Sequence, residues 1–333
     1  MLSKAEPGTY RDYNTFMKAF TDLADEHPSL MSYRTVGRSV ENRNIIMFTI
    51  GNPDGGRVFF DGAIHGEESL AGEILYSYAK WLVTSDSPLA KRILAATCTL
   101  IVPAVDADEY NIVRTNAHHV DLNRNFATNW QRVYSPDPSS WYYRGPTPLS
   151  EPESQTIASI FHTYKPSFYV NVHRGGSILY EDSYGNQTYY SLLLKKIADL
   201  SNSLNVTAYP HMSIYGSGFA MTDAAVAGIT SFLFEVMDWT TNPPISQIDS
   251  LLLPRFIPVA VVLSQECENS RASVGSDINK DGVSDLYDAL ILAAAYGSRP
   301  NNLNWNSAAD INGNGVIDLS DAIIFASNYG IKE

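Results

Sequence analysis

Residues 57–68 have the sequence Arg57-Val-Phe-Phe-Asp-Gly-Ala-Ile-His-Gly-Glu-Glu68, a strand pattern followed by the start of a helical one. The run from Arg57 to Ala63 is rich in apolar and aromatic residues and predicts a β-strand. A turn between a strand and a helix can direct the side chains of His65 and Glu68 to one point. Imidazole and carboxylate are both zinc ligands, so this stretch indicates a fold and a chemistry together.

The segments around this stretch alternate between strand and helix patterns. Strands are predicted at 33–39, 44–51, 57–63, 97–103, 168–173 and 231–236. Helices are predicted at 11–26, 68–84, 151–164, 187–203, 218–228 and 245–267. This alternation is typical of an α/β fold, a sheet flanked by helices with functional side chains at the C-terminal ends of its strands.

A third candidate ligand, His173, ends the strand-like run 167–172 in the triplet Asn171-Val-His173. Two imidazoles and one carboxylate are a ligand set of catalytic zinc, which keeps a fourth position open for water. Taken alone, His65 could be a core histidine, and Glu68 a carboxylate favoured by the dipole at a helix N-terminus. Further motifs along the chain, described below, favour a metal site over these two interpretations.

The pattern His65-x-x-Glu68 followed much later by His173 resembles that of the zinc metallocarboxypeptidases, the carboxypeptidase A-like family. The resemblance extends from about Tyr10 to about Cys267. It implies a mixed β-sheet flanked by helices and a single catalytic zinc ion. It also implies hydrolysis of the C-terminal peptide bond of peptides and proteins, with release of single amino acids.

The segment Asp121-Leu-Asn-Arg-Asn-Phe126 is similar to the family's D-x-N-R-N motif. The resemblance implies that Asn123 and Arg124 bind the free C-terminal carboxylate of the substrate. A guanidinium meets a carboxylate through two hydrogen bonds, and an amide adds a donor. Asp121 would accept the second ring N–H of His65 and so fix its tautomer.

Two further residues have roles implied by the resemblance. Arg114, in Arg-Thr-Asn, matches the arginine that polarises the scissile carbonyl and holds the developing oxyanion. Glu235 lies in the apolar run 231–237, where a carboxylate is costly unless it is paired or functional. It matches the general base that takes a proton from the zinc-bound water and gives it to the leaving amine.

The substrate pocket is implied by the segment from Tyr215 to Asp223, with the family's eight-residue interval between tyrosine and aspartate. Tyr215 would close over the substrate and donate its hydroxyl to the terminal carboxylate. Thr222, next to the pocket residue Asp223, is neutral and favours apolar or mixed terminal side chains. Glu181 and Asp182 lie where the basic-specific branch of the family places an acid, which would favour Lys or Arg.

A separate signal follows residue 276, where a twelve-residue loop occurs twice at an offset of 33 residues (310 − 277). Oxygen-bearing side chains occupy positions 1, 3, 5, 9 and 12, and Gly occupies position 6, as in the calcium loop of an EF-hand. The predicted calcium ligands, with the carbonyl of the valine at position 7, are Asp277, Asn279, Asp281, Val283, Asp285 and Asp288, then Asp310, Asn312, Asn314, Val316, Asp318 and Asp321.

This duplication resembles a type I dockerin, an all-α module that docks onto cohesin domains. The resemblance implies two structural calcium ions in residues 277–333 and a cohesin partner that contacts Leu286-Tyr287 and Leu319-Ser320 at the helix starts. The two helices are expected to pack through Leu290, Ile291, Ile323 and Ile324. The alternative is an acidic disordered tail, against which the regular spacing of apolar residues argues.

The chain of 333 residues thus divides into a catalytic domain at 1–268, a polar linker at 269–276 and the module at 277–333. Its net charge of −13 makes nucleic acid and anionic membranes poor partners. No run is apolar and long enough to cross a bilayer. Cys98 is expected to be a buried thiol, and whether it pairs with Cys267 is open.

The resemblance of residues 277–333 to a dockerin implies that the protein is extracellular or bound to the cell surface. The start of the chain, 1–6, shows no signal peptide, so either the sequence begins at the mature protein or the protein stays inside.

Two alternatives to a carboxypeptidase remain at this stage. One is a non-catalytic, carboxypeptidase-like binding protein, which the presence of Glu235, Arg114 and all zinc ligands disfavours. The other is a zinc amidase or endopeptidase acting on cell-wall peptides, which Asn123 and Arg124 disfavour because they suit a free α-carboxylate.

Overall fold

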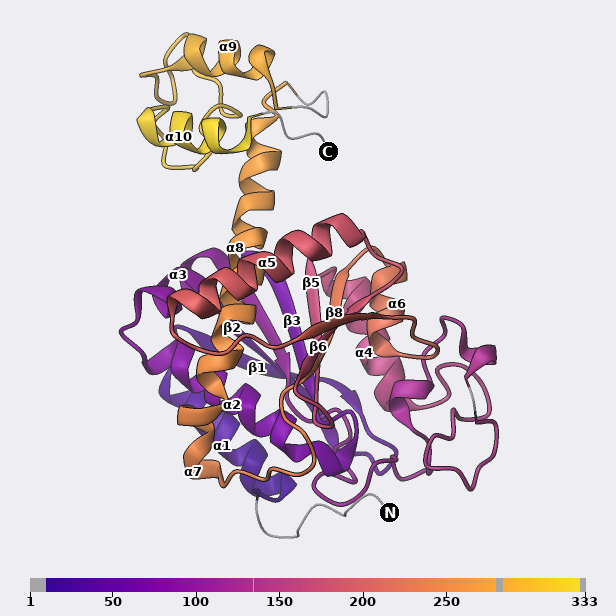
Figure 1. Ribbon diagram of the computed structural model, residues 1–333. Helices are drawn as coiled ribbons and strands as arrows, with labels where there is room; N and C mark the ends of the chain where they lie inside the picture. The colour runs from indigo at the N-terminus through magenta and orange to yellow at the C-terminus, as the bar shows by residue number, and fades with distance from the viewer. Residues whose placement is uncertain (1–9, 134, 280–283, 330–333) are drawn as a thin grey trace. The chain divides into compact units, whose positions relative to one another are not determined.

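The computed structural model describes residues 10–133, 135–279 and 284–329, except for the side chains of residues 269–275. The chain divides into two compact units, Met1–Ser264 and Gln265–Glu333. Figure 1 labels most of the helices and strands of both units.

The first unit is built on an eight-stranded sheet with the order β1-β2-β4-β3-β5-β8-β6-β7. The strands β4, β3, β5 and β8 run parallel, and antiparallel neighbours flank them on both sides. The sheet is therefore mixed, as the family resemblance implied. The strands are β1 (Met31–Arg38), β2 (Asn44–Gly51), β3 (Gly56–Gly62), β4 (Thr97–Val102), β5 (Phe168–His173), β6 (Ile178–Asp182), β7 (His211–Ile214) and β8 (Thr230–Glu235).

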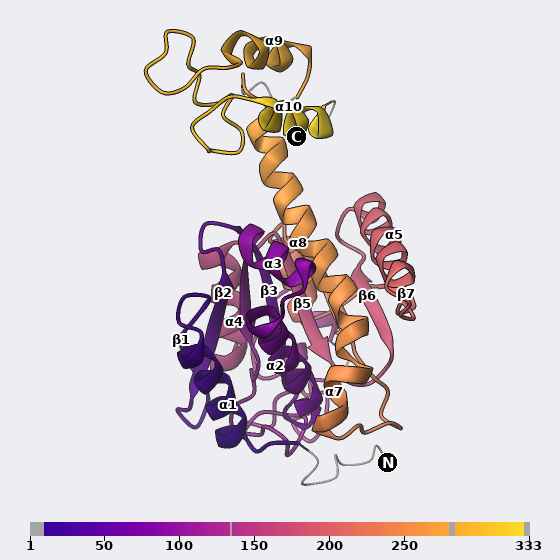
Figure 2. The ribbon, with the colours of Figure 1, turned by 90° about the vertical axis from the view of Figure 1, so that its left-hand side faces the viewer.

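Helices cover both faces of this sheet. Successive side chains of a strand point to opposite faces, so neighbouring apolar residues pack against different helices. On β3, Phe60 contacts the rings of Tyr78 and Phe256, whereas Phe59 contacts Phe161 on the other face. Figure 2 shows α2 and α8 lying over the first of these faces. The helices are α1 (Tyr13–Glu26), α2 (Ser69–Thr84), α3 (Pro88–Ala96), α4 (Pro152–Tyr164), α5 (Gln187–Ser203), α6 (Ala220–Val226), α7 (Ile245–Leu251) and α8 (Leu253–Ser276).

The register of the parallel strands decides where the functional residues meet. The C-terminal ends of β3, β5 and β8 lie at one edge of the sheet, and His173 is the register partner of Glu235. A short 3₁₀ turn, Gly66–Glu68, connects β3 to α2. The candidate ligands and the candidate base therefore gather at the edge where open α/β sheets bind their ligands.

The observed elements include several that the sequence patterns did not predict, namely α3, β6 and β7. The helix predicted at 245–267 is two helices, α7 and α8, bent by 55° at the break between them. The segment 269–276, expected to be a polar linker, is helical and belongs to α8.

The second unit contains the helices α9 (Leu286–Ala295) and α10 (Leu319–Asn328) and, among its described residues, no strand. Each helix begins with the same capping box, formed by Asp285 with Asp288 and by Asp318 with Asp321. Its core consists of Ile278, Leu292, Ala295, Ala309, Ile317 and Phe325.

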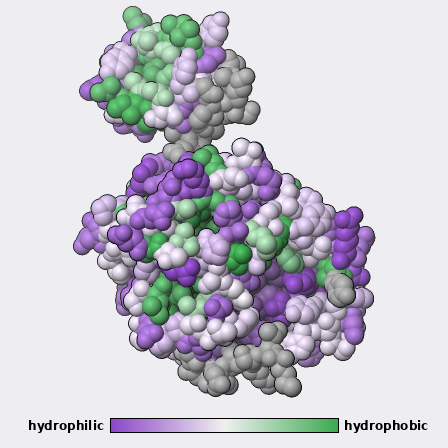
Figure 3. Space-filling view, in the orientation of Figure 1, coloured by the Kyte–Doolittle hydropathy of each residue, from purple (hydrophilic) through white to green (hydrophobic). Residues whose placement is uncertain are grey.

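The expected packing of this unit was wrong at two positions. Leu290 and Ile323 are each 58% exposed, while Leu292 and Phe325 are buried in their place. The helices are therefore rotated relative to the expectation, and apolar side chains remain on their outer surface. Figure 3 shows such hydrophobic residues on the visible face of this unit.

No single helix in the described ranges is long and apolar enough to span a membrane; the bent pair formed by Ile245–Leu251 and Leu253–Glu268 meets the criteria of length and composition only. Cys98 and Cys267, both described, are buried and not joined by a disulfide.

Candidate active site

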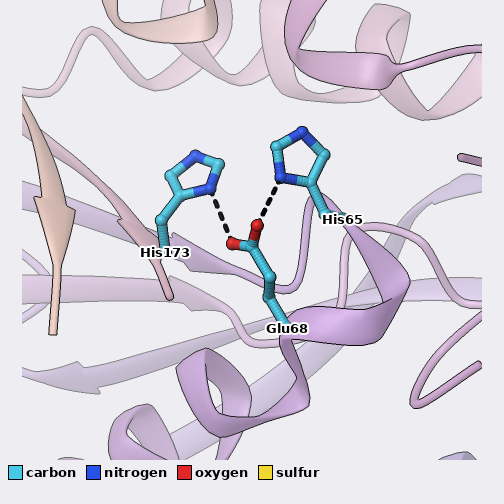
Figure 4. A group of neighbouring side chains, drawn as sticks. All are labelled: His65, Glu68 and His173. Atoms are coloured by element: carbon cyan, nitrogen blue, oxygen red, sulfur yellow. Dashed lines mark hydrogen bonds and ion pairs between the residues drawn. The ribbon is translucent and has the colours of Figure 1, made fainter. Parts of the chain in front are cut away.

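Three buried side chains, His65, Glu68 and His173, converge at the C-terminal edge of the sheet (Figure 4). The Nδ1 atom of His65 lies 2.8 Å from Oε1 of Glu68, and Nδ1 of His173 lies 2.8 Å from its Oε2. The ligand atoms all lie within 4.8 Å of one another. Two imidazole nitrogens and a carboxylate facing one point fit a zinc ion.

The turn after β3 determines the directions of two of these side chains. Ala63 has a positive φ of 48°, which turns the chain out of the strand. His65 is the N-cap of the turn that contains Glu68. Gly66 allows the backbone at Glu109 to approach closely, since a Cβ at position 66 would lie 2.2 Å from its carbonyl oxygen. A tightly packed turn therefore sets the positions of His65 and Glu68.

The second ring nitrogen of each histidine also has a partner. Nε2 of His65 lies 2.9 Å from Oδ1 of Asp121, as expected from the sequence. Nε2 of His173 lies 2.5 Å from Oδ1 of Asn171, a contact that the sequence reasoning did not include. Both rings thus present Nδ1 to the same point, so the donor set fits a metal.

The charges of the site are arranged around Glu68 and Asp121. Burial alone would raise the pKa of Glu68, but the adjacent His65 and His173 imidazoles hold it well below its usual range. Burial also opposes ionisation of Asp121, and there the Arg114 guanidinium prevails and lowers the pKa. Both carboxyl groups are therefore ionised at neutral pH, as a zinc ligand and an acceptor of a ring N–H must be.

Glu235 ends β8 beside the cluster, and its Oε2 atom is buried with no hydrogen-bond partner. Burial, and secondarily the charge of Glu68, raises the pKa of Glu235 to about 8. Gly175 leaves room for this carboxylate, because a Cβ there would lie 3.1 Å from its Oε2. A carboxylate with one free oxygen and a raised pKa has the properties of a general base.

Arg114 lies on the other side of the cluster and is held by Asp121. Its Nε and Nη2 atoms donate to Oδ2 of Asp121 over 3.0 and 2.8 Å. Its Nη1 atom is 3.6 Å from Oε1 of Glu68. The guanidinium is thus fixed at the edge of the cavity, with Nη1 directed toward the cluster.

Arg124 has no ion-pair partner among the acidic side chains that the structure describes, although it lines the same cavity. It donates to the carbonyl oxygen of Asn123 and lies over the ring of Phe219, 4.5 Å from its centroid. Burial lowers the pKa of Arg124, and the Asp121 charge only partly compensates. An unpaired guanidinium in a cavity suits an anionic ligand.

Asn123 lines the cavity, and its amide orientation is fixed by a backbone contact. The Ala220 N–H donates to its Oδ1 over 2.9 Å. Its Nδ2 therefore faces the cavity and lies 3.2 Å from Nε2 of His173.

Tyr215 lies at the rim, with 57% of its surface exposed. Its hydroxyl receives hydrogen bonds from Tyr184 and from Arg132, whose Nη1 is 3.3 Å away. In this position its hydroxyl contacts Asn129, Arg132 and Tyr184 and none of the residues His65, Glu68 and His173.

Thr222 and Asp223 do not line the cavity. The Thr222 hydroxyl donates to Asp182 over 2.8 Å, and the Asp223 carboxylate accepts the backbone N–H groups of Ala127 and Thr128. Glu181 shares a face of β6 with Leu179, opposite to the cavity residue Tyr180. Neither Glu181 nor Asp182 is among the residues that line the cavity.

The cavity has a volume of about 470 Å³ and contains His65, Glu68, Arg114, Asn123, Arg124, His173, Tyr215 and Glu235. Arg174 could have been suspected because it directly follows a ligand, whereas the wall residues from β6 and β7 had no motif to mark them. The lining residues that the sequence reasoning missed are Tyr142, Arg174, Gly175, Tyr180, Met212, Ile214, Phe219, Leu233 and Trp239.

The two predicted calcium loops lie in the second unit, and the first is described only in part. Asp281 and Val283 lie outside the described residues. In the second loop, Asp310 accepts the N–H groups of Asn314 and Gly315, and Asp321 accepts those of Asn312 and Asp318. Within the described ranges, His65, Glu68 and His173 are the only His, Cys, Asp or Glu cluster with metal-binding geometry.

Comparison with known proteins agrees with the site. The pattern of the zinc carboxypeptidase family, Peptidase_M14, matches residues 16–248, and the chain belongs to this family. It is 25% identical over 272 residues to mast cell carboxypeptidase A of Rattus norvegicus and 26% identical over 271 residues to carboxypeptidase B of Bos taurus. Each alignment covers 69% of this chain and 64% of the relative. The chain therefore spans less than two thirds of these relatives.

The fold is also similar to that of carboxypeptidase A from Helicoverpa armigera. The TM-score is 0.66 at 20% sequence identity, over 78% of this chain and 73% of that one.

Proposed function

We propose that the protein is a zinc-dependent metallocarboxypeptidase that removes single amino acids from the C-termini of peptides and proteins. The main observation is one cavity that combines the His65, Glu68 and His173 cluster with the free Oε2 atom of Glu235 and the unpaired Arg124 guanidinium. A metal site, a base and an anion site are the elements that hydrolysis next to a terminal carboxylate requires.

A zinc ion held by His65, Glu68 and His173 would polarise the scissile carbonyl and activate a water molecule. Glu235 takes a proton from that water and passes it to the leaving amine, for which its pKa of about 8 is suitable. Arg114 donates to the carbonyl oxygen as negative charge develops.

The remaining residues orient the substrate. Arg124 and Asn123 bind its terminal carboxylate. Tyr215 closes the cavity and adds a hydroxyl donor.

The test is mass spectrometry of a peptide library with free C-termini, before and after chelation and after return of zinc. Loss of single C-terminal residues that stops with chelator and resumes with zinc is the expected result. Internal cleavage, or cleavage that is confined to cell-wall peptides, would favour the amidase or endopeptidase alternative. Zinc binding without any cleavage would favour the binding-protein alternative.

We also expect a preference for apolar or aromatic terminal residues. Leu233, Met212 and Ile214 line the cavity, whereas the acidic Glu181 and Asp182 do not. Peptides that end in Leu or Phe should be cleaved with a kcat/KM at least about tenfold above matched peptides that end in Lys or Arg, since an apolar wall leaves a cation unpaired. Faster cleavage of peptides that end in Lys or Arg would indicate that Asp182 reaches the substrate. Asp182→Asn should then abolish the preference for these basic residues.

For the second unit, we propose a docking module that binds two calcium ions and then a cohesin domain. The duplicated loop, the two capping boxes and the exposed Leu286, Tyr287 and Leu319 support this proposal. Because dockerin modules act outside cells, it carries the further proposal of an extracellular or cell-surface location.

Calorimetry of the full chain at saturating zinc tests the calcium proposal. We expect two calcium ions per chain, because acidic side chains crowd each loop and repel one another without a cation. Asp310→Asn with Asp318→Asn should remove one of the two. Peptidase activity should survive deletion of 277–333, since its residues all precede that segment. No calcium uptake by the parent chain would refute the module and leave the peptidase proposal intact.

A further inference from the structure

Three buried polar side chains behind His173 have no role in the site described so far. Tyr169, Asn171 and His173 alternate along β5 and therefore point to the same face of the sheet. Asp61, on the adjacent β3, is the register partner of Asn171. Tyr169, Asn171 and Asp61 are all fully buried. Polar groups at the centre of a sheet are costly unless they bind one another.

These groups form a continuous chain of hydrogen bonds. The Tyr169 hydroxyl donates to Oδ2 of Asp61 over 2.8 Å, and Nδ2 of Asn171 donates to its Oδ1 over 2.8 Å. Oδ1 of Asn171 lies 2.5 Å from Nε2 of His173. Asp61 thus uses both carboxyl oxygens and reaches the imidazole through one amide.

The direction of the Asn171 amide determines the state of the imidazole. Asp61 offers Asn171 an acceptor, so the NH₂ group must face Asp61 and the carbonyl oxygen must face His173. An oxygen at 2.5 Å from Nε2 requires a proton on that nitrogen. The lone pair of His173 is then on Nδ1, which faces Glu68 and His65.

A second neighbour of His173 would favour the opposite tautomer. Nδ2 of Asn123 lies 3.2 Å from the same Nε2 and offers a donor. If Asn171 were free to turn its own NH₂ toward the ring, both neighbours would be donors and Nε2 would become an acceptor. The proton would then be on Nδ1, where the metal must bind. Asp61 excludes this arrangement by holding Asn171.

We propose that Asp61 is a positioning residue for zinc binding, which acts through Asn171 to keep the proton of His173 on Nε2 and the lone pair of Nδ1 available to the metal. It corresponds to Asp121, which does the same for His65 by direct contact. The inference rests on the proposed zinc site. A partner of this kind contributes about 10–100-fold to metal affinity.

The test measures the zinc dissociation constant of the full-length protein by competition with a chelator. Asp61→Leu keeps the branched shape of the side chain and removes the acceptor, and we expect zinc to bind about 10–100-fold more weakly. Asp61→Asn should remain within about threefold of the parent, since its carbonyl oxygen still accepts from Asn171 and its NH₂ can donate to the Tyr169 oxygen. Tyr169→Phe is the matched control, because it removes a partner of Asp61 but leaves Asn171 held. It should lower thermal stability without changing zinc affinity.

Equal zinc affinity of Asp61→Leu and the parent would overturn the inference. An equal loss in Asp61→Leu, Asp61→Asn and Tyr169→Phe would also overturn it, since that pattern indicates a structural role. A parent that binds no zinc would instead refute the proposed metal site.

If Asp61→Leu does not fold, ¹⁵N–¹H spectra of the zinc-loaded parent decide the question. The His173 Nε2–H proton, identified by its absence in His173→Gln, should be shifted downfield and exchange slowly with solvent. Rapid exchange of this proton would overturn the inference.

Discussion

Glu235→Gln is expected to retain one zinc ion and the native fold while losing turnover by about 10²–10⁴-fold, the usual effect of removing a general base. The amide has nearly the same shape but cannot accept a proton from water. Because Oε2 of Glu235 has no hydrogen-bond partner, the substitution breaks no hydrogen bond of that atom and should not disturb the metal ligands. The measurements are kcat for a peptide substrate and zinc content by metal analysis.

Glu181→Gln is the matched control for this substitution. Glu181 is buried, and its Oε2, like that of Glu235, has no hydrogen-bond partner, but its side chain lies on the face of β6 opposite to the cavity residue Tyr180. Its kcat should equal that of the parent. Loss of zinc together with activity in Glu235→Gln would show that Glu235 is a ligand and not the base.

Amidating the C-terminus of a good substrate should reduce kcat/KM roughly 30-fold to 1,000-fold, which corresponds to about 2–4 kcal/mol, because it removes the anion that we propose Arg124 binds. Arg124→Ala should cause a similar loss with the free peptide. With the amidated peptide, the same substitution should have little further effect, since the charge pair is already absent.

This pair of changes forms a double-mutant cycle, and the two losses should not add. Additive losses would mean that Arg124 acts elsewhere than on the carboxylate. Equal rates for free and amidated peptides in the parent would indicate an endopeptidase or an amidase.

The sequence predicted the centre of the site better than its walls. His65, Glu68 and His173 lie in spaced motifs at strand ends, and strand ends could be recognised from apolar runs. The walls contributed by β6 and β7 were missed, since these strands are short and contain polar residues such as Asp182 and His211. Their strand structure depends on pairing with β8 and with each other, which no local pattern reports.

Two other failures have related physical causes. The packing of α9 and α10 was assigned to Leu290 and Ile323, but both helices are apolar over much of their circumference, so periodicity did not select the buried face. The contact between Asp61 and Asn171 depends on the register of β3 against β5, and register cannot be obtained from either strand alone.

The order of strands in the sheet places the hydrolytic residues and the cavity wall in regions that tolerate substitution differently. His65, His173 and Glu235 are held by the central strands and the turns that follow them, where both faces are covered and substitutions are costly. Tyr180, Met212 and Ile214 belong to β6 and β7 at one edge of the sheet. Edge strands and loops tolerate exchange far better than a core does. Descendants of this protein could therefore acquire new substrate preferences by altering the edge while the hydrolytic residues stay unchanged.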